Sequence, residues 1–445
     1  MLIEFSVGNY RSFKERVTLS MVAADIASQP PSLDEQNVFV IGDDLRLLTS
    51  AAIYGANASG KSNLMVALGF MRFLVLTSSR ETQLSELIQV EPFRLSTQTE
   101  RQPTLFETVF RVGDIQYRYG FEVMPEGVNA EWLYQLGEKR ERLLFTRANG
   151  TIQVNARNFR EGRGLEQRTR TNALFLSVVA QFNGKIASLV LRWFHHLTIT
   201  SGIAQEHEFA LSVKLNRDTP YRAAIEQLVK RLDIGIDAIS FESRPLTFSD
   251  SISAGVKQSL QMLFDELSKG EGPVEMISVQ TQHQRYDAEG NPIDQIMFDL
   301  AHHESAGTQR LFSLAGPFLR TLNEGGVFVI DELDSRLHPN LVIELIRLFH
   351  SPETNPHHAQ IIFTTHNTNL LNAKLFRRDQ VWFVEKSRHG ASDLYSLVEY
   401  RQDGKIVRND ASFEKDYVAG RYGAVPFIGD LGALLGTEHG EKTRP

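Results

Sequence analysis

The residues whose types and spacing most clearly indicate chemistry lie at positions 55–62, where the chain reads Gly-Ala-Asn-Ala-Ser-Gly-Lys-Ser. Glycines and small residues at this spacing let the backbone curl so that successive N–H groups face one phosphate group. Lys61 would add a positive charge near the β- and γ-oxygens, and Ser62 would offer a hydroxyl to Mg²⁺. We therefore predict a phosphate-binding loop for a nucleotide. Its predicted contacts are Gly55, Asn57, Ser59, Gly60, Lys61 and Ser62.

Two carboxylates, Asp331 and Glu332, follow an apolar run over residues 327–330. Such a run is typical of a buried parallel strand, which delivers its last residues to the carboxyl edge of a sheet, where ligands bind. We expect Asp331 to hold Mg²⁺ through its water shell and Glu332 to orient and deprotonate an attacking water. Because a strand followed by two acids is common in α/β proteins, the pair alone leaves an ordinary strand end as the alternative.

Two more groups lie on either side of these acids in the sequence. Residues 304–310 read Glu-Ser-Ala-Gly-Thr-Gln-Arg and open a predicted helix, whose N-terminus would let Ser305 and Gly307 donate to a γ-phosphate. Taken alone, Ser305 equally fits a plain helix cap. His366 ends a second apolar run, over residues 361–365, and a single histidine at a strand end is usually structural. The order of the four motifs is what favours one nucleotide site.

Hydrophobic periodicity predicts the elements that must position these groups. Apolar residues on one face indicate a helix after the phosphate-binding loop, and alternation with period two indicates antiparallel hairpins. The segment at residues 29–35 is predicted to break structure. The other predicted elements are a strand at 49–54, a helix at 63–76, hairpins within 104–134 and 274–299, mostly helical structure at 171–235 and a last strand at 380–384.

The order of these four motifs, with Asp334 following the two acids, resembles the ABC-type ATPase superfamily, where they are called Walker A, signature, Walker B and switch histidine. Within that superfamily, residues 5–13, 331–339 and 364–367 are similar to the RecF/SMC/OLD-like branch. Residues 417–426, which read Tyr-Val-Ala-Gly-Arg-Tyr-Gly-Ala-Val-Pro, resemble the stand-alone RloA/AbiL-type AAA-family ATPases of bacterial anti-phage defence loci.

The resemblance implies an α/β fold: an ABC-type ATPase head with a P-loop sheet, an antiparallel β-subdomain and a short helical insertion in place of a coiled coil. It also implies ATP and Mg²⁺ as bound groups, with two subunits sandwiching ATP. Arg11 would lie beside the phosphates, Asp334 at the dimer seam, and His366 would sense the γ-phosphate. The Q-loop glutamine of the family has no clear counterpart, and Gln89 is the candidate for it. Ser305 and Gly307 would reach the ATP of a second subunit, and Gln309 is a further expected nucleotide-binding residue.

The predicted organisation has four parts. Residues 1–155 form an N-terminal ATPase lobe with Walker A and the β-subdomain, and residues 156–272 form a basic loop and a helical insertion. Residues 273–436 form a C-terminal ATPase lobe with the signature, Walker B and the switch histidine, and residues 437–445 form a tail. No heptad pattern is sustained over three or four repeats, so a long coiled-coil arm is not expected.

Composition limits the class of protein. The 445 residues are 42% hydrophobic and include no cysteine, which allows a large core and excludes disulfides and cysteine-ligated metals. No run of about 18 apolar residues occurs, and the first residues lack the basic and apolar regions of a secretion signal. We therefore expect a cytoplasmic protein with no membrane partner.

The net charge of −7 is unevenly distributed, because residues 139–170 carry nine Lys or Arg and three Glu. This segment is predicted either to grip phosphates or an acidic partner, or to be a solvated loop. Paired histidines elsewhere are interpreted as surface or cap residues rather than metal ligands, because adjacent side chains point apart. The arginines of the basic segment that stand among Asn and Gly are Arg157, Arg160, Arg163, Arg168 and Arg170.

Two classes of function fit these motifs. The first is a dimeric, or higher even-numbered, switch that binds and hydrolyses ATP, senses a trigger and controls a separate effector in anti-phage defence. OLD-type enzymes append a TOPRIM nuclease after the switch histidine, and too few residues follow His366 for one, so a TOPRIM-like or other nuclease would be the partner. The alternative is a RecF-like, ATP-gated clamp on DNA in repair, with nucleic acid as the partner. A transporter motor is a poor match to the RecF-like segments at residues 5–13, 331–339 and 364–367.

Overall fold

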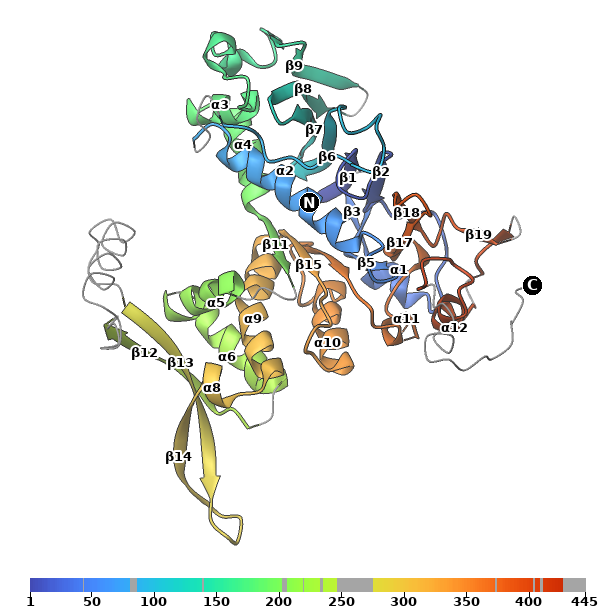
Figure 1. The fold of residues 1–445 in the computed structure, drawn as a ribbon. Coiled ribbons are helices and arrows are strands. Elements are labelled where there is room, and N and C mark those ends of the chain that lie inside the picture. Colours follow the sequence, from blue (N-terminus) through green and yellow to red (C-terminus); the bar gives the residue numbers. More distant parts are fainter. Residues whose placement is uncertain are drawn as a thin grey trace, which may run out of the picture. The chain divides into compact units, whose positions relative to one another are not determined.

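The computed structural model shows a mixed α/β protein, as expected from the motifs (Figure 1). The chain divides into two compact units: the first contains Met1–Gly202, Thr321–Ser335 and Val342–Pro445, and the second contains Ile203–Arg320 and Arg336–Leu341. The predicted tail at 437–445 lies outside the described residues, and the predicted lobe boundaries stay a prediction. The residues that the structure describes are 1–42, 44–80, 86–137, 140–201, 206–218, 220–232, 235–245, 275–372, 374–402, 405–408 and 411–426.

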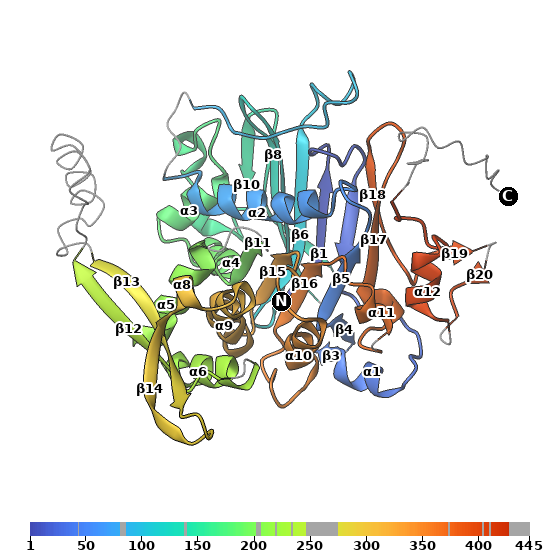
Figure 2. The same cartoon turned by 60° about the horizontal axis from the view of Figure 1, so that its bottom comes forward.

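The first unit contains a six-stranded sheet in the order β11-β15-β16-β5-β17-β18 (Figure 2). Its first five strands are parallel, and β18 runs antiparallel to β17. The central strands are buried at nearly every position, which explains why their sequences are continuous apolar runs. The strands predicted before the phosphate-binding loop, Asp331 and His366 are confirmed. The bounds are β11 Leu197–Ser201, β15 Val327–Asp331, β16 Gln360–Thr364, β5 Ser50–Tyr54, β17 Val381–Lys386 and β18 Ser392–Ser396.

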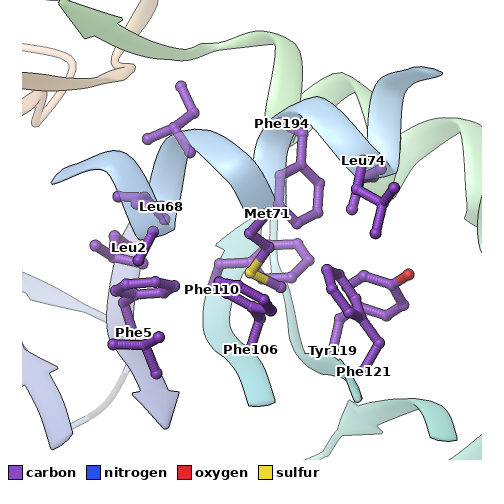
Figure 3. Close-up of a cluster of buried hydrophobic side chains, with 14 of the residues drawn as sticks. Leu2, Phe5, Leu68, Met71, Leu74, Phe106, Phe110, Tyr119, Phe121 and Phe194 are labelled. Atoms are coloured by element: carbon purple, nitrogen blue, oxygen red, sulfur yellow. The ribbon is translucent and has the colours of Figure 1, made fainter. Parts of the chain in front are cut away.

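Helix α2 (Lys61–Thr77) begins within the phosphate-binding loop and contacts strands of two sheets. It touches β15 and β11 of the parallel sheet and β1 of a seven-stranded antiparallel sheet, ordered β10-β9-β8-β7-β6-β1-β2. Figure 3 shows Leu68 and Met71 of α2 packed with Phe5 and Phe106 of that sheet. This buried layer fixes the position of the helix N-terminus. The strands are β1 Leu2–Gly8, β2 Val17–Ser20, β6 Thr104–Val112, β7 Ile115–Met124, β8 Gly127–Leu136, β9 Glu141–Ala148 and β10 Thr151–Val154, and β6–β7 confirms the hairpin predicted within 104–134.

Shorter elements complete the first unit. The segment predicted to break structure at residues 29–35 runs into the short helix α1, where Leu33 is buried and gives the turn an apolar contact. The segment at 171–235 is largely helical as predicted, but it also contains strand β11, which periodicity did not reveal. The elements are α1 Ser32–Gln36, β3 Val38–Ile41, β4 Leu45–Leu48, η1 Arg160–Gly162, η2 Glu166–Arg168, α3 Phe175–Gln181, α4 Lys185–His195, α11 Asn369–Asn372, η3 Arg378–Gln380, β19 Arg401–Gln402, β20 Lys405–Ile406 and α12 Phe413–Val418.

The second unit packs helices against a three-stranded sheet, β12-β13-β14. Its core includes Ile225, Val229, Leu300 and Phe312. Strands β13 and β14 form the antiparallel hairpin predicted over residues 274–299. No helix among the described residues is both long enough and apolar enough to cross a bilayer. The elements are α5 Glu206–Asp218, α6 Tyr221–Leu232, β12 Ala238–Pro245, β13 Glu275–Tyr286, β14 Pro292–Asp299, α8 Leu300–His303 and the start of α9 Ala306–Glu324, and α10 Pro339–His350 also begins here.

Candidate nucleotide-binding site

Three neighbouring parallel strands of the first unit end at the same edge of the sheet. Strand β16 lies between β15 and β5, with Phe363 opposite Ile330 on one side and Thr364 opposite Ile53 on the other. The phosphate-binding loop follows β5, Asp331 ends β15, and His366 follows β16 after one residue. The sheet therefore gathers the predicted loop, acids and histidine at its carboxyl edge, where ligands bind in α/β proteins.

Lys61 holds the phosphate-binding loop in shape by donating hydrogen bonds to two of its carbonyls. Its Nζ lies 2.9 Å from the oxygen of Gly55 and 3.1 Å from that of Ala56. Burial lowers the pKa of Lys61 from its usual value, and the nearby charges of Asp331 and Glu332 oppose that shift. The loop carbonyls thus hold the ammonium group, and the two carboxylates favour its charged form, which is the form that can neutralise phosphate charge.

The two glycines of the loop are required by close approach of the surrounding chain. At Gly60, where φ is +116°, a Cβ would lie 2.5 Å from the hydroxyl oxygen of Ser392 and 2.6 Å from that of Ser12. At Gly55 a Cβ would collide with the carbonyl oxygen of Val384. Side chains at either position would therefore push the loop away from its supports. Ser12 and Ser392 were not predicted, because neither stands in a motif.

The loop also presents groups that are free to meet a ligand. Asn57 and Ser62 are exposed, whereas Ser59 is 3% exposed and its hydroxyl has no hydrogen-bond partner within the described residues. A buried hydroxyl without a partner is costly unless a ligand or water completes it. The position of the Ser59 hydroxyl in the loop fits a hydrogen bond to a bound phosphate.

The two acids at the end of β15 are joined by the hydroxyl of Thr364. This hydroxyl donates to Asp331 Oδ1 at 2.5 Å and accepts from the backbone N–H of Glu332 at 2.7 Å. Glu332 has a positive φ of +54°, a conformation that is uncommon for residues other than glycine. Thr364 was not predicted as a site residue. The available signal was a polar residue ending an otherwise apolar strand.

His366 lies near enough to the same groups for their charges to act on it. Burial and then the charge of Lys61 lower the pKa of His366 below its usual value, while Asp334 and Glu332 oppose the shift. A histidine with a lowered pKa is neutral near pH 7, so its imidazole can both donate and accept a hydrogen bond. Asp334 Oδ1 is buried without a hydrogen-bond partner in the part of the chain that the structure describes.

Arg11 lies in the turn after β1 and lines a pocket beside the first turn of α2. Its guanidinium pairs with Glu91 at 2.9 Å, and the neighbouring Ser12 accepts a hydrogen bond of 2.8 Å from Asn63. The pocket has a volume of about 460 Å³, and Lys386 also contributes to its lining. The turn is therefore tied to the helix that begins at the phosphate-binding loop, and contact of Arg11 with phosphates stays a prediction.

Tyr417, in helix α12, supports the start of the phosphate-binding loop. Its ring lies 5.7 Å from that of Tyr54, the residue directly before Gly55. Its hydroxyl donates to the carbonyl of Ala424 at 3.2 Å. The sequence marked this segment through its resemblance alone, whereas the structure shows it packed against the end of the strand that leads into Walker A. Gln89, the Q-loop candidate, is exposed, and its amide contacts the carbonyl of Leu87.

The residues of the signature motif belong to the second unit. Ser305 accepts a hydrogen bond from the N–H of Thr308 at 3.1 Å, as a helix cap does. Gln309 donates to the carbonyls of Ala301 and Glu304, each at 3.1 Å. The cap role of Ser305 is thus present in the structure. Contact of Ser305, Gly307 and Gln309 with a nucleotide stays a prediction.

The metal predicted at this site suits its donors. Mg²⁺ is usually held by one or two protein oxygens together with substrate phosphates and waters, rather than by an all-protein cage. Asp331 and Ser62 would supply a carboxylate and a hydroxyl, and the described residues contain no group of three or more His, Asp or Glu able to hold a metal ion. The paired histidines accordingly join no such group within those residues.

Residues 50–372, from β5 to the end of α11, match a protein-family model described as "AAA domain, putative AbiEii toxin, Type IV TA system". The match covers most of the chain. The chain belongs to this AAA-domain family. Membership makes it a P-loop protein of the AAA and ABC type, in agreement with the gathered motifs. No curated protein matches the chain.

Proposed function

We propose that this chain is an ATPase that works as a dimeric switch and controls a separate effector protein in anti-phage defence. The observation that carries the proposal is the gathering of Lys61, Asp331, Glu332 and His366 at the carboxyl edge of one sheet, in a member of an AAA-domain family. These are the parts that phosphoryl transfer needs: a phosphate cradle, a metal ligand, a base and a group to contact the γ-phosphate.

Each part has a chemical role that its surroundings support. The loop amides and Lys61 hold the phosphates at the N-terminus of α2. Ser62 and, through the ion's water shell, Asp331 would hold Mg²⁺, which would supply positive charge to the phosphates. Glu332 accepts the proton of the attacking water, and the neutral His366 offers a hydrogen bond to the γ-phosphate. ATP hydrolysis would then change the protein's affinity for its partner, because a ligand shifts an equilibrium only by its differential affinity.

Sharing of the site between two subunits is tested by complementation. Lys61→Ala and Gly307→Asp should each be inactive alone. Mixing them should restore about a quarter of the parental ATPase activity in a random mixture with independent sites, since half the dimers carry one intact composite site. The measurement is phosphate release after co-refolding or co-expression. Mixed dimers that form but stay inactive would contradict a signature acting in trans.

A Ser305→Ala protein separates the capping role of Ser305 from its predicted role in the site of the second subunit. Removing the cap should cost about 1 kcal/mol of stability, so a circular dichroism melt reports the structural part. Because a Cβ at Gly307 would lie 3.0 Å from the carbonyl oxygen of Arg336, the same melt must show that Gly307→Asp is folded.

A DNA clamp is the second candidate, and the basic segment favours it. Arg157, Arg160 and Arg163 are exposed, and none of them makes an ion pair within the described residues. The segment is anchored beneath by Phe159, which is fully buried. Arg170 differs, because its guanidinium is half-buried and donates to the backbone carbonyls of Ser78 and Ser79. Arg168 is exposed as well, and its guanidinium lies 5.9 Å from the centre of the Phe182 ring. Four of the five arginines are thus presented to solvent, and Arg170 is structural.

One experiment separates the two candidates. Glu332→Gln protein with ATP is titrated with duplex DNA across a salt series. In parallel, the same protein is used to pull down the candidate partner, the protein encoded by the neighbouring gene. An effector switch should retain that partner more strongly with ATP than with ADP and should show little specific affinity for DNA. A clamp should bind DNA with a steep salt dependence, which replacement of Arg157, Arg160 and Arg163 by glutamine should reduce by up to about three units of slope.

The control removes equal charge elsewhere. Lys214, Arg217 and Lys230 are exposed on α5 and α6, and their replacement by glutamine should leave the slope unchanged. Tight, steeply salt-dependent DNA binding without a protein partner would overturn the switch in favour of the clamp.

A further inference from the structure

Thr364 is an unusual residue for its position. It ends β16, whose preceding residues are Ile361, Ile362 and Phe363, and it is 0% exposed. Valine would fill the same space without a polar group. Burying a hydroxyl costs free energy unless the group is hydrogen-bonded. The hydroxyl at this strand end therefore needs partners, and the structure provides two.

The donor and the acceptor of each of these two hydrogen bonds can be assigned. The backbone N–H of Glu332 can only donate, so the oxygen of Thr364 accepts there, and the single hydroxyl proton goes to Asp331 Oδ1. A third bond runs from the N–H of Leu333 to the carbonyl of Thr364 at 3.1 Å. One residue of β16 thus holds the three successive residues 331–333 at the end of β15.

These bonds constrain the carboxylate of Asp331 and the backbone of Glu332, whose orientations the proposed reaction depends on. The bond to Oδ1 sets the rotation of the Asp331 carboxylate and hence the direction of its second oxygen. The bond from Glu332 N–H helps to hold that residue at its positive φ, a conformation that persists only when the surroundings enforce it. We propose that Thr364 is a positioning residue that aligns Asp331 toward Mg²⁺ and Glu332 toward the attacking water. This inference rests on the ATPase function proposed above.

The test is Thr364→Val, which keeps the shape and removes the hydroxyl. We expect kcat to fall about 10- to 100-fold while KM for ATP changes by less than about threefold. The Mg²⁺ concentration needed for half-maximal binding of a fluorescent ATP analogue should rise at least about threefold. Thr364→Ser restores the hydroxyl and should recover both values to within about threefold of the parent. The binding readout does not depend on turnover.

Thr200→Val is the matched control. Thr200 lies on β11, opposite Ile330 on the other side of β15. It is 8% exposed, and its hydroxyl has no hydrogen-bond partner within the described residues. The same substitution there removes a buried hydroxyl beside the same strand without touching either acid. Its kcat and Mg²⁺ dependence should equal those of the parent.

Two results would overturn the proposal: parental kcat and Mg²⁺ dependence in a folded Thr364→Val protein, or a serine variant no better than the valine variant. If Thr364→Val does not fold, Thr364→Ser against Thr364→Ala gives the same comparison of hydroxyl present and absent. A parent that binds Mg²⁺-ATP without hydrolysing it would refute the ATPase function, while the Mg²⁺ titration would still decide the effect on Asp331. A parent that binds no nucleotide would refute both.

Discussion

Glu332→Gln should bind ATP with parental affinity and hydrolyse it at least about a hundredfold more slowly. The amide cannot accept the proton of the attacking water, whereas the loop held by Lys61 and the carboxylate of Asp331 remain in place. The substitution is nearly isosteric, and the bond from the backbone N–H of residue 332 to Thr364 does not involve the side chain. Single-turnover hydrolysis and equilibrium ATP binding, measured on the same sample, check both halves of this expectation.

Because hydrolysis is blocked after ATP binds, this variant should also accumulate the closed dimer, which light scattering or analytical ultracentrifugation would detect. Glu344→Gln is the matched control, since Glu344 is an exposed glutamate on α10 that pairs with Arg347. Near-parental hydrolysis by Glu332→Gln would remove Glu332 from the role of base.

Lys61→Ala should lose at least about a hundredfold in ATP affinity, because it removes the cation that neutralises the β- and γ-oxygens. It also removes the two hydrogen bonds to the carbonyls of Gly55 and Ala56 that hold the loop in shape. Lys61 is at the start of α2, and the core face of that helix is formed by other residues. We therefore expect the far-ultraviolet circular dichroism spectrum to match that of the parent.

Titration with a fluorescent ATP analogue measures the loss. Lys230→Ala, which removes an exposed lysine from α6, should bind ATP as the parent does. An unchanged affinity in Lys61→Ala would mean that residues 55–62 do not form the phosphate site, whatever their spacing.

The sequence alone determined the local parts of this protein. The apolar runs before Gly55, Asp331 and His366 predicted buried strands, and the structure has them, because a parallel strand covered on both faces favours apolar residues at successive positions. The common edge of those strands follows from their parallel direction. Glycine spacing likewise marked the loop, since backbone approach at Gly60 excludes side chains.

Tertiary structure alone decided which residues support that site. Thr364 joins two acids more than thirty residues earlier in the chain, and the ring of Tyr417 packs against Tyr54, directly before the phosphate-binding loop. Strand register and packing create these contacts, and no local pattern encodes a distant partner. The same holds for Arg170. Composition grouped it with a basic surface, but its hydrogen bonds to the carbonyls of Ser78 and Ser79 give it a structural role. Residue type and spacing specify chemistry, but the partner of a buried polar group is chosen by the fold around it.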